Sequence, residues 1–198
     1  EGTIRWTGLP DAIHPYMSAY TTMAALARGE HDQVVEDFYW YLLHSSATHA
    51  FPEGIFYRRR FAWSDTIPHT TGAANYALML RHMLIHEQED ELHLLAGAPD
   101  GWLAEGKEIR VERAPTHFGP VDMTVSGTAK GVLVRFKGAD QRKPERVVLH
   151  LLVSRPLDAP IPGVTVSTRP DQRKQWGFAT VVEMYAKTAP PLPRTIRD

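Results

Sequence analysis

The chain has 198 residues, of which 22 are Lys or Arg, 23 are Asp or Glu and 43% are hydrophobic, so its formal net charge is −1. This composition predicts a globular protein with a packed core and excludes a disordered chain. The absence of cysteine excludes disulfides and cysteine-based zinc or thiol chemistry without fixing a compartment, and no apolar run approaches the roughly 20 residues that a membrane helix needs.

The small net charge hides an asymmetry between the two halves. Residues 1–100 hold thirteen acidic and six basic residues, and residues 101–198 hold ten acidic and sixteen basic ones, which gives net charges of −7 and +6. The basic residues of the second half form no dense stripe with interleaved aromatic side chains, so we expect neither nucleic acid nor a membrane as a partner. No phosphate-binding glycine loop or dinucleotide motif is present, so we expect no cofactor.

Three segments of the first hundred residues have helical periodicity. Pro15 suits the opening turn of the first, which ends at Gly29. Its expected apolar face holds Met17, Tyr20, Met23, Ala24 and Ala27. Asp32 is placed to cap the second, whose expected apolar positions are Val34, Val35, Phe38, Tyr41 and Leu42. The third runs from Gly72 to about Glu87 and is apolar on nearly all sides, which predicts an interior helix.

Such an interior helix needs more neighbours than two other helices can provide. Two helices cannot cover all sides of a third helix. We therefore expect the helical part, residues 1–104, to pack against helices from a barrel region that precedes this chain or from a partner chain.

The pattern changes after residue 105, where β-branched residues alternate with polar ones. Six strands are expected, over residues 108–111, 121–125, 132–136, 147–153, 164–167 and 178–185. Strands at this spacing without intervening helices predict a small antiparallel β-sandwich over residues 105–198. The proline-rich tail, APPLPRT at 189–195, is expected to be an extended strap. The fold class is thus α+β.

The stretch between the second and third helices carries the most chemistry. A carboxylate follows a proline at Glu53, aromatic rings recur at Tyr57, Phe61 and Trp63, and three arginines occupy 58–60. Carboxylates, aromatic faces and guanidinium groups are the groups with which proteins hold and hydrolyse sugars. The stretch therefore predicts a carbohydrate site.

Three motifs in this region occur in the order known from one enzyme class. They are Pro52-Glu53-Gly54, IPHTTGAANYALMLRHML at 67–84 and ELHLLAGAPDGWL at 91–103. In this order they resemble the C-terminal end of six-hairpin α/α-barrel glycosidases, over about residues 12–126. In the glucoamylase-type family a Pro-Glu pair before the last barrel helix supplies the general base, a role that falls here on Glu53. In the inverting α-L-fucosidase family the last helix leads into a segment like 91–102 and then a β-sandwich.

The resemblance implies hydrolysis of a glycosidic bond with inversion, with the general acid supplied from elsewhere in the barrel. This chain alone would then be inactive. The fucosidase pattern has a catalytic aspartate where this chain has Pro68, followed by His69, so fucosidase chemistry is not carried over. Asp65, three residues earlier, is at best a displaced substitute.

The candidate substrate-binding residues are Trp63, Asp65, His69, Tyr57 and Arg59. Each has an ordinary structural alternative. Glu53 is either the base or a solvated loop carboxylate, and Trp63 either stacks on a sugar ring or belongs to a local core. Asp65 either binds hydroxyls or caps a turn, and the arginines either hold the ligand or pair with acidic residues of the first half.

His69 either donates to a ligand or satisfies the backbone at the entrance of the third helix. His14 stands at the entrance of the first helix and is a candidate for the border of the site. His82 and His86 are four residues apart on the expected third helix, but no Glu follows His82 and no third ligand is evident, so we expect no metal.

Three interpretations of the whole chain remain open. The first is the C-terminal portion of a glycoside hydrolase that supplies one wall of the site. The second is a non-catalytic accessory module that binds a glycan or a partner subunit through Trp63 and the arginines. The third is a structural role in which the helices join the β-sandwich to another domain.

Overall fold

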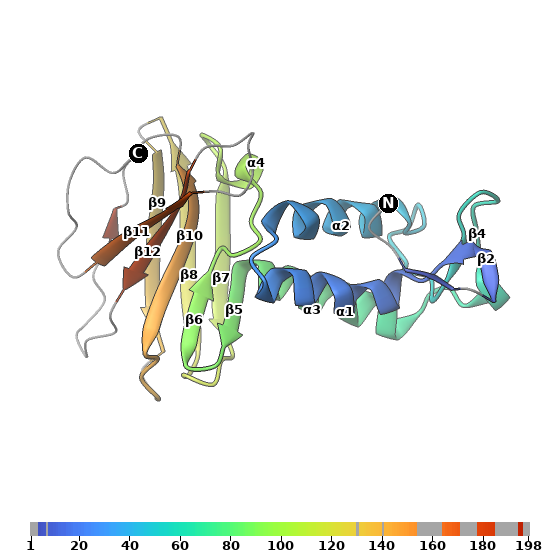
Figure 1. Cartoon of the computed structure of the whole chain (residues 1–198), viewed down its shortest axis with the longest axis horizontal. Coiled ribbons are helices and arrows are strands. Elements are labelled where there is room, and N and C mark those ends of the chain that lie inside the picture. Colours follow the sequence, from blue (N-terminus) through green and yellow to red (C-terminus); the bar gives the residue numbers. More distant parts are fainter. Residues whose placement is uncertain are drawn as a thin grey trace. The chain divides into compact units, whose positions relative to one another are not determined.

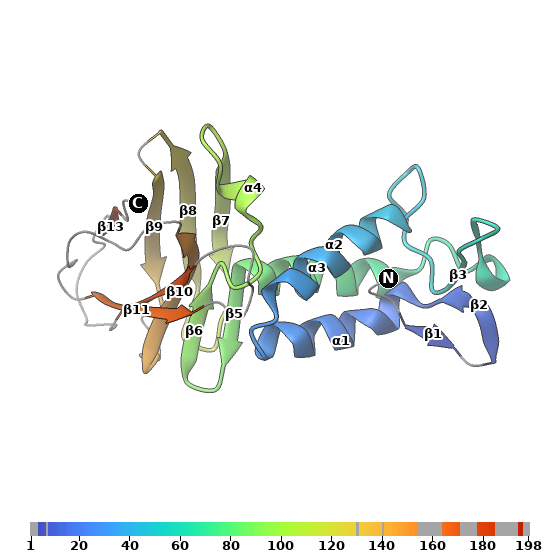
Figure 2. The same ribbon diagram turned by 45° about the horizontal axis from the view of Figure 1, so that its top comes forward.

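The computed structural model describes residues 4–6, 8–129, 131–139, 141–153, 164–170, 178–184 and 194–195 (Figures 1 and 2). Within these residues the fold is mixed α+β, with four α-helices and three sheets, which confirms the expected class. The chain forms two compact units, Glu1–Leu84 and Ile85–Asp198, so the division falls at Leu84 whereas the sequence pattern placed it at residue 104. None of the helices in the described part is long and apolar enough to cross a membrane.

Unit 1 consists of three helices and a small sheet. The helices are α1 (Pro15–Ala27), α2 (His31–Leu43) and α3 (Thr70–Leu84), and α1 packs against both of the others (Figure 2). The first two are confirmed close to the expected bounds. The sheet joins four short antiparallel strands in the order of the chain: β1 (Arg5–Trp6), β2 (Leu9–Ile13), β3 (Ile55–Phe56) and β4 (Phe61–Ala62).

The buried face of α1 differs from the expected one. Met17 and Tyr20, on the apolar face predicted from periodicity, are 41% and 59% exposed. The side chains that face the core are smaller and partly polar: Pro15, Ser18, Ala19, Thr22, Ala25 and Leu26. They can be buried because Thr22 donates its hydroxyl to the Asp37 carboxylate of α2 at 2.6 Å, so the polar groups are satisfied within the interface.

Burial of α3 is one-sided, contrary to the expectation of an interior helix. Its fully buried positions are Gly72, Asn75, Met79 and Met83. Leu78 is 42% exposed, and Ala73, Ala74 and Ala77 beside it are exposed as well. The helix also ends at Leu84 rather than near Glu87, because the next residues pair as a strand.

That strand is β5 (Ile85–Gln88), which forms an antiparallel hairpin with β6 (Glu91–Leu94). Pairing sets Ile85 opposite Leu94, and both are at most 1% exposed. Sheet pairing and this burial override the helical periodicity, which continues through the same residues. The expectation that His82 and His86 lie on one face of the same helix is therefore wrong. His82 lies in the last turn of α3, and His86 lies in strand β5.

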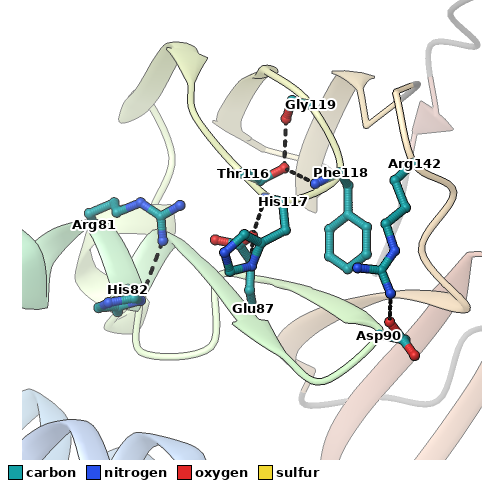
Figure 3. Close-up of polar contacts among 9 residues, drawn as sticks. All are labelled: Arg81, His82, Glu87, Asp90, Thr116, His117, Phe118, Gly119 and Arg142. Carbon is teal, nitrogen blue, oxygen red and sulfur yellow. Dashed lines mark hydrogen bonds and ion pairs between the residues drawn. The ribbon is translucent and has the colours of Figure 1, made fainter.

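Side chains fasten the β5–β6 hairpin to loops of unit 2. Glu87 Oε1 accepts a hydrogen bond from the backbone N–H of His117 at 2.5 Å, and Asp90 Oδ1 lies 2.5 Å from an Arg142 guanidinium nitrogen (Figure 3). The backbone N–H of Glu145 donates to the Asp90 carbonyl at 2.7 Å. These contacts explain why the hairpin belongs to unit 2 although it follows α3 without a linker.

Unit 2 consists of two sheets that lie against each other (Figures 1 and 2). The six expected strands are confirmed as β7 (Glu108–Ala114), β8 (Val121–Thr128), β9 (Gly131–Gly138), β10 (Arg146–Val153), β11 (Val164–Pro170) and β12 (Phe178–Met184). With β13 (Arg194–Thr195), the sheet orders are β11-β12-β10-β6-β5 and β13-β9-β8-β7. Short helix α4 (Asp100–Leu103) precedes β7. The core is formed by alternate residues of both sheets, among them Leu92, Leu94, Leu149, Val121, Met123 and Val125.

One pair of strands departs from the expected antiparallel arrangement. β6 and β10 are parallel, with Leu92 opposite Val147. A parallel pair needs a long crossover between its strands, and here the whole β7–β8–β9 sheet intervenes. Of the expected C-terminal strap, residues 189–193 lie outside the described residues, and Arg194–Thr195 form β13, which pairs with β9.

Candidate functional site

The register of the small sheet in unit 1 gathers three residues at one end. Ile13 of β2 pairs with Ile55 of β3, and Ile55 pairs with Ala62 of β4. Because both pairs are antiparallel, the next residue outward on each chain is His14, Gly54 or Trp63. The backbone N–H of Trp63 donates to the Gly54 carbonyl at 2.9 Å, which continues the pairing by one step.

The side chains at this end are in close contact. The His14 ring is 3% exposed and meets the Trp63 ring edge-to-face, with centroids 5.3 Å apart. A Cβ added to Gly54 would lie 3.0 Å from His14 Cε1 and 3.3 Å from Trp63 Cε3. Position 54 is therefore filled by the two rings, and a glycine is the residue that fits between them.

Two backbone hydrogen bonds hold the segment that contains Glu53, just before Gly54. Its N–H donates to the Thr66 carbonyl at 3.1 Å, and the N–H of His69 donates to the Phe51 carbonyl at 2.8 Å. The segment before β3 is thus hydrogen-bonded to the loop between β4 and α3, which contains a cis Ile67–Pro68 peptide. The Glu53 side chain is partly buried. These bonds fix the backbone of the residue that carries the carboxylate.

His69 has the structural role that the sequence left open. Its Nδ1 accepts the backbone N–H of Gly72 at 3.1 Å, which satisfies one of the amide groups at the start of α3. Its ring also packs edge-to-face on Tyr16, with centroids 5.1 Å apart. Asn75 completes the link between the helices by donating its amide to the Tyr16 carbonyl at 2.8 Å.

The electrostatics of the site centre on His14 and Glu53. Burial lowers the pKa of the His14 imidazole below its ordinary value, and the charge of Glu53 opposes part of this shift. Burial is the larger of the two effects, so the surroundings of His14 favour its neutral imidazole.

The other predicted residues lie farther along the same segment. Asp65 is exposed, closes the short 3-10 helix Trp63–Asp65 and has a φ of 55°, a left-handed conformation that Asp tolerates better than most residues. Its carbonyl accepts the N–H of Ile67 at 2.9 Å, as expected for a turn residue. Trp63 is partly buried, so its ring belongs both to the local packing and to the surface.

Tyr57 and the arginines lie in the β3–β4 turn. Arg58 donates through Nε to the Tyr57 hydroxyl at 3.3 Å and lies 4.0 Å from the Asp11 carboxylate, so it pairs in part with an acidic residue of the first half. The N–H of Arg59 donates to the Phe56 carbonyl at 3.1 Å, and the Arg59 side chain is exposed. The turn thus presents charge to solvent at the end of the β3–β4 hairpin opposite to Gly54 and Trp63.

Tyr16 was not singled out as a site residue from the sequence, and His14 was considered as a helix-entrance residue that could border the site. Both follow β2 directly. One sequence signal pointed to this site: the short apolar segments Ile55–Phe56 and Phe61–Ala62 on either side of the arginine turn form a hairpin. Pairing of β2 with that hairpin is a non-local event that sequence periodicity does not encode.

Within the described residues, no group of three or more His, Asp or Glu side chains is arranged to hold a metal ion. No protein-family model matches the chain, and no curated protein and no solved structure was found to match it. The site is therefore interpreted from its own geometry.

Proposed function

We propose that this chain supplies one wall of a carbohydrate-cleaving site and that Glu53 is its general base. The observation that carries the proposal is the backbone position of Glu53: its N–H donates to the Thr66 carbonyl, and it directly precedes Gly54, which is packed between the rings of His14 and Trp63. A carboxylate on a turn that is packed by an aromatic ring and an imidazole is a candidate to activate water next to a sugar.

The reaction is the hydrolysis of a glycosidic bond with inversion. It requires a second, protonated carboxyl group about 6.5–9.5 Å from the base, so that a water molecule fits between them. In this proposal the acid comes from a preceding barrel region or a partner chain, and the chain alone is inactive.

The helices support an α/α-barrel origin through the apolar side chains that they leave exposed. Met17 and Tyr20 on α1 and Leu78 on α3 are 41%, 59% and 42% exposed. In this proposal the further helices of a barrel would cover these side chains, as contiguous exposed apolar patches commonly mark interaction surfaces. The two facing sheets of unit 2 fit the β-sandwich that follows the barrel in the resembled families.

Glu53→Gln in the whole protein, assayed against a panel of glycosides, tests the assignment. Loss of the base lowers kcat/KM by about 10²–10⁴-fold. Glu36→Gln is the matched control, because Glu36 is exposed on α2 and its glutamine can still accept the hydrogen bond from Trp40 Nε1. Unchanged turnover in Glu53→Gln would refute the assignment of Glu53 as the general base.

A non-catalytic glycan-binding module is the second candidate. It is favoured by the partly exposed Trp63 at one end of the β3–β4 hairpin and the exposed arginines of the turn at the other, because aromatic faces and guanidinium groups bind sugars without cleaving them. Titration of the isolated chain with oligosaccharides, followed by tryptophan fluorescence, separates the two functions. Saturable binding by the folded chain, abolished in Trp63→Ala, together with unaltered turnover in Glu53→Gln, would favour the module.

A further inference from the structure

Two histidines of unit 2 meet across the parallel strands β6 and β10 (Figure 1). His93 Nδ1 lies 2.8 Å from His150 Nε2, and the ring centroids are 5.1 Å apart. The register explains this contact, because Val148 pairs with His93 and His150 follows two residues later on the same face of the sheet. Two imidazole nitrogens at this distance are hydrogen-bonded, so they hold one proton between them.

Two charged side chains extend this contact. His93 Nε2 lies 3.2 Å from Glu91 Oε2, and Arg146 donates through Nε to Glu91 Oε1 at 2.8 Å. The four side chains form a chain of polar contacts that runs from Arg146 on β10 to Glu91 and His93 on β6 and back to His150 on β10. We call it the β6–β10 polar chain. Its charges are weakly screened by water, because the His93 and Glu91 side chains are only 14% and 22% exposed.

The β6–β10 polar chain can accommodate one added proton. If His93 becomes an imidazolium, one of its ring N–H groups faces the Glu91 carboxylate and the other donates to the neutral nitrogen of His150. A second proton does not fit, because both facing nitrogens then carry a hydrogen and neither can accept. It also sets three cations, at His93, His150 and Arg146, against the single carboxylate of Glu91.

The strands on either side of this pair contribute two more titratable residues. His86 of β5 pairs with His93, and their ring centroids are 6.0 Å apart, so a proton on His86 adds to the repulsion. On β12, the register sets Val181 opposite His150 and Glu183 opposite Val148. The facing nitrogens of His93 and His150 are the point at which a second proton breaks a hydrogen bond.

We infer that the β6–β10 polar chain is a pH-sensitive connection within unit 2, intact while His93 and His150 share one proton and broken when both are protonated. Histidines that water can reach freely are protonated below about pH 6.5. The open state then binds one proton more than the intact connection, so the connection loses stability as pH falls below this value. A difference of one proton changes the opening equilibrium about tenfold per pH unit.

Hydrogen exchange of the backbone amides in the 198-residue chain tests this connection. Exchange is measured by mass spectrometry on peptides that cover β6 and β10, and protection is corrected for the intrinsic pH dependence of exchange. We expect wild-type protection to fall by up to about tenfold per pH unit between about pH 6.5 and 5. Protection that stays constant over this range overturns the inference.

Variants of the two histidines separate the shared proton from other effects of acid. In His150→Gln the amide can hydrogen-bond to His93 in either protonation state, so the fall in protection with pH becomes shallower than in wild type. His117→Gln is the control, because the His117 side chain is 82% exposed and its Nδ1 lies 3.3 Å from Glu87 Oε1, where a proton is accommodated. It keeps the wild-type slope. A wild-type slope in His150→Gln, or an equally shallow one in His117→Gln, overturns the inference.

The slope decides the matter even if His150→Gln lowers protection at every pH. If that variant does not fold, His93→Asn carries the same prediction, since its amide lies near the position of His93 Nδ1.

Histidine titration by NMR on the unmodified chain gives an independent readout. Because the two rings share a proton, the signals of His93 and His150 should change in two separate steps that both rings report. A single step for each ring, near the ordinary midpoint of about pH 6.5, overturns the inference.

Discussion

Replacing Gly54 by Ala tests how tightly the ends of the small sheet meet. The added Cβ would lie 3.0 Å from His14 Cε1, 3.1 Å from His14 Nδ1 and 3.3 Å from Trp63 Cε3. These separations are shorter than the 3.5–4.0 Å or so at which carbon atoms pack best, so the rings have to move by several tenths of an ångström. Overpacking of this kind costs roughly 1–3 kcal/mol. We expect about 1–2 kcal/mol, because Trp63 is partly exposed and can yield while the buried His14 cannot.

The assay is urea unfolding followed by the circular dichroism of the helices, which lie mostly in unit 1. Gly101→Ala is the matched control, because a Cβ there meets nothing within 4 Å and Gly101 lies in helix α4, where alanine is the better residue. The reasoning is refuted if Gly54→Ala changes the unfolding free energy by less than about 0.5 kcal/mol, the range of ordinary surface substitutions.

Two further outcomes concern the core. Burial raises the pKa of Asp37, against the hydrogen bonds from Thr22 and Gln33. A carboxyl group whose pKa is higher in the folded than in the unfolded state stabilises the fold below its unfolded pKa, and this contribution is lost as pH rises through the folded pKa. In urea unfolding, Asp37→Asn should therefore gain stability relative to wild type as pH rises from acidic to neutral. A difference in stability that stays constant with pH would contradict this. In Gly127→Ala the new Cβ would lie 2.0 Å from the Ala104 carbonyl oxygen, so we expect unit 2 to lose about 3 kcal/mol or more in chemical denaturation, and a loss below about 1 kcal/mol would contradict the packing.

The strands from β7 to β12 were predictable because their signal is local. Alternation of buried and exposed residues is visible within single segments such as Val121–Thr128, where every second residue from Val121 to Val125 is buried. The β5 strand was not predictable, because Ile85–Gln88 continues the periodicity of α3. Its conformation is decided by pairing with Glu91–Leu94 and by the contacts of Glu87 and Asp90 with distant loops.

The same distinction applies to the candidate site. Glu53 stood out because a proline precedes it and a glycine follows it, which is a local feature. The neighbourhood of Glu53 depends on the register of strands only two to five residues long, which brings His14 and Trp63 together from far apart in the sequence. The apolar face of α1 was misjudged for a related reason, since the hydroxyl of Thr22 finds its partner on another helix.

The parallel pairing of β6 with β10 determines where the chain can be divided for study. Arg146–Leu149 of β10 pair with Glu91–Leu94, and Val147, Val148 and Leu149 are at most 3% exposed. A fragment that starts at residue 105 would lose β5 and β6 and leave this apolar stretch as an unprotected sheet edge, which is a template for aggregation. A fragment that starts at Ile85 keeps the edge covered, so the soluble form of unit 2 begins where the helix ends.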